Sequence, residues 1–201
     1  MESREGRERS RNAKTTATDE ATDGALMILG LDISTSITGY TLIKEDKIIL
    51  NGAWDTRKYK DFFEKVIHVK KGLEQIYSEY GEQITAVYIE QSLQSFRSGF
   101  SSAKTLSTLS RFNGIVSWLV FDQYKIKPEY LAATSARKLC GIKVPRGQKA
   151  KQVVLNFLVD NEPAFVLEYT RNGNPKPECY DKADSMVIAK AGVVCERENS
   201  K

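Results

Sequence analysis

Hydrophobic residues form short runs that are typical of buried strands. A nearly continuous apolar run at 26–33 predicts a central strand, because strands buried on both faces lack polar alternation. Runs at 39–43 and 48–54 follow across tight turns, which predicts a three-stranded antiparallel meander. A fourth run at 84–89 is apolar enough to be central, and 128–133 predicts a fifth strand.

Apolar residues elsewhere recur at helical spacing. Helices are expected at 61–79, 103–124, 135–139, 147–159 and 180–194. The resulting order is three strands, helix, strand, helix, strand and further helices. It predicts the α/β class, with a mixed five-stranded sheet in which an antiparallel meander precedes parallel strands, flanked by helices.

The two ends of the chain lack this patterning. Residues 1–25 are polar without periodicity and predict a disordered tail, so the folded domain is expected at 26–195, followed by a short tail at 196–201. No apolar run approaches the roughly 18 to 20 residues that cross a bilayer, and the N-terminus shows no secretory signal. The three cysteines form no CxxC pair. We therefore expect a cytoplasmic protein without a membrane partner.

Positive charge is concentrated between 125 and 151. Eight basic residues and one acid, Glu129, give this stretch a net charge of +7, whereas the whole chain carries +4. Such a charge suits a polyanion, although a solvated surface fits the charge alone equally well. The only histidine, His68, lies in a lysine-rich helical stretch. Its position disfavours catalysis by a Ser–His–Asp or Cys–His mechanism.

Four carboxylates lie where an isolated charge is costly. Asp32 and Glu90 end two apolar strands, and Asp181 and Asp184 are three residues apart on one face of the last helix. Taken singly, each could be a turn cap, an ion-pair partner or a helix N-terminal charge. Taken together, they can converge on one point, where their mutual repulsion requires cations.

Oxygen-only ligands favour Mg²⁺, for which Mn²⁺ can substitute. Two such ions can clamp a phosphodiester while water attacks the phosphorus in line. The basic stretch would hold a nucleic acid next to these ions, so the two signals explain each other. The residues therefore predict a metal-dependent nuclease.

Three short motifs resemble those of RuvC-type Holliday junction resolvases (crossover junction endodeoxyribonucleases). Their order and separation are more specific than any one of them, and the resemblance spans about residues 26–194. The motifs are Ile28-Leu-Gly-Leu-Asp32 with Thr38-Gly39-Tyr40, then Ile89-Glu90-Gln91, then Asp181-Lys-Ala-Asp184-Ser.

This resemblance implies an RNase H-like fold and a homodimer formed through helix 103–124. It implies that the partner is four-way or other branched DNA, cut by paired nicks with two divalent ions per active site. Asp32, Glu90, Asp181 and Asp184 would be the catalytic metal ligands. Lys149 would be a catalytic lysine that offsets developing negative charge. The other basic residues expected to bind DNA are Arg137, Lys138, Lys143, Arg146 and Lys151.

The sequence departs from the family in two places. Ile33-Ser34 follows the first aspartate, where the family often has Pro-Gly. The family also carries an aromatic residue after the second motif that opens the junction centre. Leu93 occupies that offset here, and Phe96 lies three residues further on, next to Arg97. All three are candidate DNA contacts through stacking or phosphate binding, although a loop anchored on the core fits them equally well.

Three other functions fit part of the sequence. Leu31–Gly39 resembles the first phosphate motif of actin-like sugar kinases, but that fold needs two lobes and the chain shows no obvious second glycine-rich loop. A non-catalytic junction-binding dimer would leave four acids to repel phosphates. A flap or fork nuclease keeps the same chemistry, and the sequence does not distinguish it from a resolvase.

Overall fold

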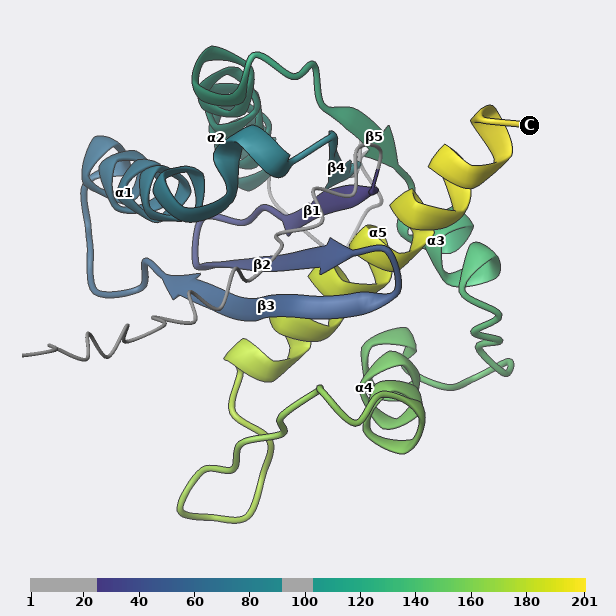
Figure 1. Cartoon of the computed structure of the whole chain (residues 1–201). Helices are drawn as coiled ribbons and strands as arrows, with labels where there is room; N and C mark the ends of the chain where they lie inside the picture. Colours follow the sequence, from purple (N-terminus) through teal and green to yellow (C-terminus); the bar gives the residue numbers. More distant parts are fainter. Residues whose placement is uncertain (1–24, 92–102) are drawn as a thin grey trace, which may run out of the picture.

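The computed structural model describes residues 25–91 and 103–201. Its centre is a five-stranded sheet with the order β3-β2-β1-β4-β5. The first three strands form an antiparallel meander, and β4 and β5 extend it in parallel on the other side of β1, as the hydrophobic pattern predicts (Figure 1). The strands are β1 Met27–Asp32, β2 Ile37–Lys44, β3 Lys47–Asp55, β4 Ala86–Glu90 and β5 Glu129–Leu131.

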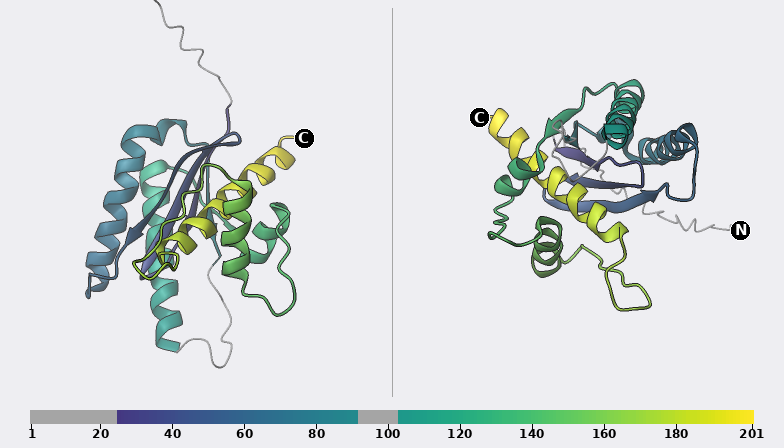
Figure 2. Two further views of the ribbon diagram at one scale, coloured as in Figure 1. Left: turned by 90° about the horizontal axis from the view of Figure 1, so that it is seen from below. Right: turned by 180° about the vertical axis from the view of Figure 1, so that it is seen from behind.

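Five α-helices cover the two faces of this sheet in the described part of the chain. The helices α1 and α2 pack on one face, and α3, α4 and α5 lie on the other (Figures 1 and 2). None of the helices in these two ranges is both long and apolar enough to cross a membrane. The helices are α1 Phe62–Tyr80, α2 Ala103–Tyr124, α3 Ala133–Leu139, α4 Ala150–Asn161 and α5 Glu178–Asn199.

The last helix is longer than its apolar spacing predicts. Residues 196–199, expected in a C-terminal tail, continue α5. The Tyr88 hydroxyl donates a hydrogen bond to Glu196 at 2.6 Å, and Arg197 forms an ion pair with Asp46 at 2.9 Å. These contacts lie outside the apolar stripe, which explains why the spacing of hydrophobic residues ends too early.

Alternation along the strands divides their side chains between two cores. Ile28 and Tyr88 belong to the core under α5, whereas Leu29 and Val87 belong to the core under α1 and α2. Side chains two residues apart point to the same face of a strand. The acids that end β1 and β4, at even-numbered positions, therefore belong to the face that α5 covers.

Glycines let α5 approach the sheet very closely. A Cβ atom added to Gly30 of β1 would lie 2.5 Å from the backbone nitrogen of Ala189. A Cβ atom added to Gly39 of β2 would lie 2.0 Å from the carbonyl oxygen of Asp181. Real side chains do not tolerate such distances, so these glycines set the height of α5 above the strands.

A buried hydrogen-bond network holds the first turns of α5 against β2 and β3. The hydroxyls of Thr41 and Ser185 share a hydrogen bond at 2.9 Å. The Asn51 amide donates to Thr41 Oγ1 at 2.8 Å and to the carbonyl of Lys182 at 3.0 Å. Each of these polar groups therefore has a partner, and the network ties α5 to the sheet within one turn of Asp184.

Candidate metal centre and nucleic-acid interface

Three carboxylates meet at one edge of the sheet. Asp32 ends β1 and Glu90 ends β4, and these neighbouring strands are parallel, with Leu31 paired to Ile89. Asp184 comes from α5, which crosses directly above them. One oxygen atom from each of the three carboxylates lies within 4.8 Å of the others, which is close enough to hold one metal ion.

The fourth predicted acid, Asp181, lies one turn before Asp184 on α5 and completes the four-acid cluster (Asp32, Glu90, Asp181 and Asp184). A lysine from the first turn of α4 reaches into this cluster. Lys151 Nζ is 3.3 Å from Asp184 Oδ2 and 3.9 Å from Asp181 Oδ1. Three of the four predicted acids therefore lie close enough to share one ion, and Asp181 lies beside them through the lysine that it shares with Asp184.

Burial raises the pKa of every acid in the cluster. Burial and then the charges of Glu90 and Asp184 hold the pKa of Asp32 well above its usual range. Burial and the charge of Asp184 raise the pKa of Glu90 to about 7, and burial raises that of Asp181 to about 6. Burial also raises the pKa of Asp184, against the attraction of Lys151. A divalent cation would favour the ionised forms of all four.

The lysine at the cluster is Lys151 rather than the expected Lys149. Lys149 is the exposed N-cap residue of α4 and lines a separate surface hollow with Gln148 and Gln152. Of the basic residues in the described ranges, Lys151 forms the ion pairs with the cluster. Burial disfavours its charge, but attraction to Asp184 and Asp32 outweighs burial and raises the pKa of Lys151. This lysine therefore stays charged beside the acids.

The remaining basic candidates lie in the last turn of α3 and in the loop that leads to α4. Arg137 is half-buried, and its charge lowers the pKa of both Glu90 and Asp184, so it faces the cluster. Arg137, Lys138 and Lys143 line one surface hollow, and Arg146 is exposed in the following loop. The basic surface thus borders the acids. The other three candidates, Leu93, Phe96 and Arg97, lie outside the described residues.

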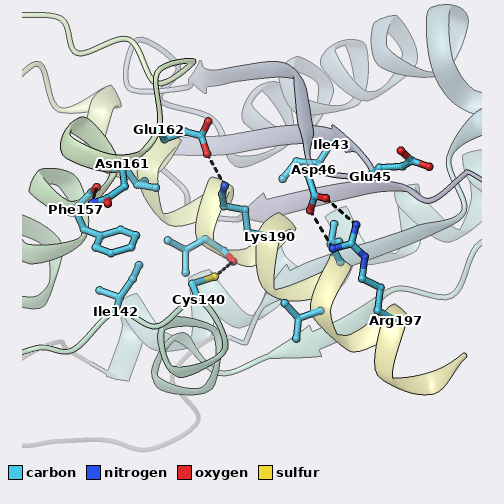
Figure 3. Close-up of a pocket in the computed structure, with 14 residues that line it drawn as sticks. Ile43, Glu45, Asp46, Cys140, Ile142, Phe157, Asn161, Glu162, Lys190 and Arg197 are labelled. Carbon is cyan, nitrogen blue, oxygen red and sulfur yellow. Dashed lines mark hydrogen bonds and ion pairs between the residues drawn. The ribbon is translucent and has the colours of Figure 1, made fainter. Parts of the chain in front are cut away.

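An apolar hollow lies away from the cluster, around the second half of α5. Its volume is about 270 Å³, and its walls include Ile142, Phe157 and Val187. Figure 3 shows that charged residues at its rim pair with one another: Lys190 with Glu162, and Arg197 with Asp46. No acid of the cluster lines this hollow.

Solved structures provide a separate test of the architecture. RuvC of Thermus thermophilus, in complex with a Holliday junction substrate, aligns with a TM-score of 0.60 and 12% identity over 87% of this chain and 97% of that one. The yeast mitochondrial Holliday junction resolvase Ydc2 aligns with a TM-score of 0.57 and 15% identity over 87% and 80%. The chain has a RuvC-type RNase H-like fold. No protein-family model and no curated protein matches the sequence.

Within this RuvC-type fold, sequence reasoning missed the residues that position the cluster. The Thr41–Ser185 hydrogen bond and the Asn51 amide fix α5 but carry no motif of their own. One signal was available, because Ser185 directly precedes the apolar run 186–189 of α5. A polar residue that is buried with such a run needs a partner, and Thr41 of β2 supplies it.

Proposed function

We propose that this chain is a metal-dependent endodeoxyribonuclease that resolves four-way DNA junctions by paired nicks. The observation that carries the proposal is the convergence of Asp32, Glu90 and Asp184 within 4.8 Å, beside Lys151 and a basic surface. A buried acid that serves only the fold is normally paired with a base. The four acids of this cluster have too few basic partners to balance their negative charge. Oxygen ligands of this kind suit Mg²⁺ or Mn²⁺.

The four acids, Lys151 and the exposed basic residues would each have a different role in hydrolysis. Asp32, Glu90 and Asp184 would hold two divalent ions together with Asp181, and when bound these ions would supply Lewis acidity for the attacking water and the phosphate. Lys151 Nζ offsets the negative charge that develops on the phosphate oxygens. The exposed residues bind the backbone on either side of the scissile bond; they are Lys138, Lys143, Arg146 and Lys149, with Arg137 nearer the acids.

Two observations support branched DNA and a homodimer. The structural neighbours are a Holliday junction resolvase and a RuvC protein in complex with a Holliday junction substrate, and both share this fold. On α2, Trp118 and Phe121 are 59% and 49% exposed, as expected of a helix that pairs with a second copy. A two-fold dimer would present two identical sites to the two strands that must be nicked.

The deciding experiment is a cleavage assay on a synthetic four-way junction with and without Mg²⁺. We expect symmetric paired nicks from the wild-type protein, and a rate about a thousand-fold lower for Asp32→Asn with junction binding retained. The matched control is Glu162→Gln, which removes an acid that is paired with Lys190 outside the cluster and should leave cleavage intact.

Each other outcome assigns the chain differently. If the wild-type protein binds the junction without cutting it in Mg²⁺ or Mn²⁺, the chain is a junction-binding module. Faster cutting of flap or fork substrates would make it a branched-DNA nuclease of looser specificity. Absence of both binding and cutting would overturn the nuclease proposal and favour a nucleotide-binding phosphotransferase, which direct ATP binding would test.

A further inference from the structure

An ordered hairpin precedes α5 and lies outside the machinery described so far. In this 166–176 hairpin, Tyr169 pairs with Pro175, and the Thr170 amide donates a hydrogen bond to the Asn174 carbonyl at 2.7 Å. The turn contains Gly173 with φ of +75°, a conformation that glycine adopts without strain. The hairpin therefore has a defined shape rather than being only a connection.

Its base is attached to α5 between two acids of the cluster. Lys182, only 8% exposed, donates a hydrogen bond from Nζ to the Val166 carbonyl at 3.2 Å and lies 3.6 Å from Glu168 Oε1. The Glu168 amide also donates to the Cys179 sulfur at 3.4 Å. Because Lys182 lies between Asp181 and Asp184 in α5, the position of the hairpin is tied to that of the acids.

The tip presents an aromatic ring and a positive charge to solvent. Tyr169 is 57% exposed, and Arg171 is exposed two residues later. Lys176 is paired with Glu168 at 2.7 Å, so its charge is neutralised within the hairpin. Within residues 25–91 and 103–201, neither the Tyr169 ring nor the Arg171 guanidinium has a hydrogen-bond, ion-pair or ring partner.

We propose that the 166–176 hairpin is a further DNA-contacting element, beside the metal centre. Arg171 binds a backbone phosphate of the strand that leads to the site, since a planar guanidinium matches phosphate oxygens. Tyr169 stacks on a base whose face is exposed at the branch point. This inference rests on the proposed nuclease function. Figure 2 shows the hairpin next to the start of α5, the end of the helix that carries the acids.

The two contacts predict different responses to the shape of the DNA. A phosphate contact forms on any duplex, so Arg171→Gln should weaken binding to a junction and to a linear duplex alike. Removing one phosphate contact should also lower the slope of log affinity against log salt by about 0.9. A duplex interior exposes no base face, so Tyr169→Ala should weaken junction binding about tenfold and barely change duplex binding.

The test measures both DNAs in the Asp32→Asn background, which prevents cutting, over a range of salt concentrations. The matched control is Lys47→Gln, which removes an exposed charge from the first residue of β3, at the other end of β2 from Gly39, and should change neither affinity nor salt slope beyond a small general effect. Melting temperatures equal to that of the parent show that the exposed hairpin substitutions leave the fold intact.

A second readout is cross-linking. The photoreactive residue p-benzoylphenylalanine in place of Tyr169 should attach to junction DNA on irradiation. If the parent binds the junction while both hairpin variants bind with unchanged affinity and slope, the hairpin inference is wrong and the nuclease proposal stands. If the parent itself does not bind branched DNA, both fail together.

Discussion

The two halves of α5 differ in how the charges of their side chains are balanced. In the second half of the helix, Lys190 pairs with Glu162 and Arg197 with Asp46 around an apolar hollow. At the start of the helix, Asp181 and Asp184 of the four-acid cluster share one ion-pair partner, Lys151. One helix thus carries a region of matched charges and a region of excess negative charge.

This difference supports placing the proposed chemistry at the start of α5 rather than at the apolar hollow. Paired surface charges contribute little and can be replaced without much effect. Half-buried acids that repel one another lower the free energy of unfolding. Their raised pKa values reflect the same energetic cost. Such a cost persists where a bound cation relieves it, which is why we place the proposed metal site at the acids and not at the apolar hollow.

The largest effect is expected from removing Lys151, the lysine that pairs with Asp181 and Asp184. Lys151→Met should lower single-turnover cleavage of a four-way junction about a hundredfold while retaining binding, because a charge next to the scissile phosphate is lost. Lys149→Met, two positions earlier and on a different face, is the control and should change the rate by less than about threefold. Equal effects would contradict the assignment of Lys151.

Displacing the start of α5 should damage the acidic region next. Gly39→Ala places a Cβ atom against the Asp181 carbonyl, so we expect a loss of about 2 kcal/mol in the free energy of unfolding together with weaker metal binding. Urea denaturation measures the first and Mn²⁺ titration the second. Gly114→Ala is the control, because a Cβ atom there meets nothing within 4 Å and should stabilise α2 slightly. Unchanged stability in Gly39→Ala would show that α5 does not depend on this close approach.

A change of pH should alter the acidic region and leave the paired region alone. The pKa of Glu90 rises from 4.5 to about 7 on folding, so the metal-free folded protein binds more protons than the unfolded chain between these values. Its free energy of unfolding should therefore fall as pH rises from about 5 to 8, and Mg²⁺ should restore it at pH 8. Below pH 6, metal affinity should fall about tenfold per unit for each proton displaced.

Thermal melting at pH 5 and pH 8, in EDTA and in Mg²⁺, measures this effect. Glu90→Gln is the control variant, because it removes one of the titrating groups and should reduce the pH dependence. A metal-free protein that is equally stable at both pH values would contradict the inferred repulsion within the cluster.

The smallest effect is expected in the paired region. Arg197→Gln breaks an ion pair whose partner, Asp46, is well exposed, and should cost less than about 1 kcal/mol of unfolding free energy. Cleavage should stay at the wild-type rate. A loss of activity comparable to that of Lys151→Met would mean that the two ends of α5 are not independent.

The order of the strands and helices could be predicted because buried apolar residues recur along the sequence with the period of the strand or helix that carries them. The helix at 103–124 has the predicted bounds, and β1 and β4 coincide with the two most apolar runs. The convergence of Asp32 and Glu90 could also be predicted, since neighbouring parallel strands end at the same edge. These features depend on local pattern or on simple sheet geometry.

The choice between Lys149 and Lys151 could not be predicted in the same way. It depends on the register of α4, which begins at Ala150, whereas the apolar spacing suggests a start near 147. An uncertainty of one turn in where α4 begins is enough to change which of the two lysines faces the acids. The hairpin before α5 was likewise expected only as a loop over 171–177. Lys182, which holds the base of the hairpin, follows it in the chain, so the sequence of the loop itself does not reveal this contact.

The path of the chain through the four-acid cluster has a consequence for its synthesis. β1 leaves the ribosome early with Asp32, whereas Asp181 and Asp184 are translated after every other element described here. A nascent chain can form the meander and the core beneath α1 and α2 while still lacking two of the four acids of the cluster. On the proposed function, the capacity to cut DNA would therefore arise only when α5 docks.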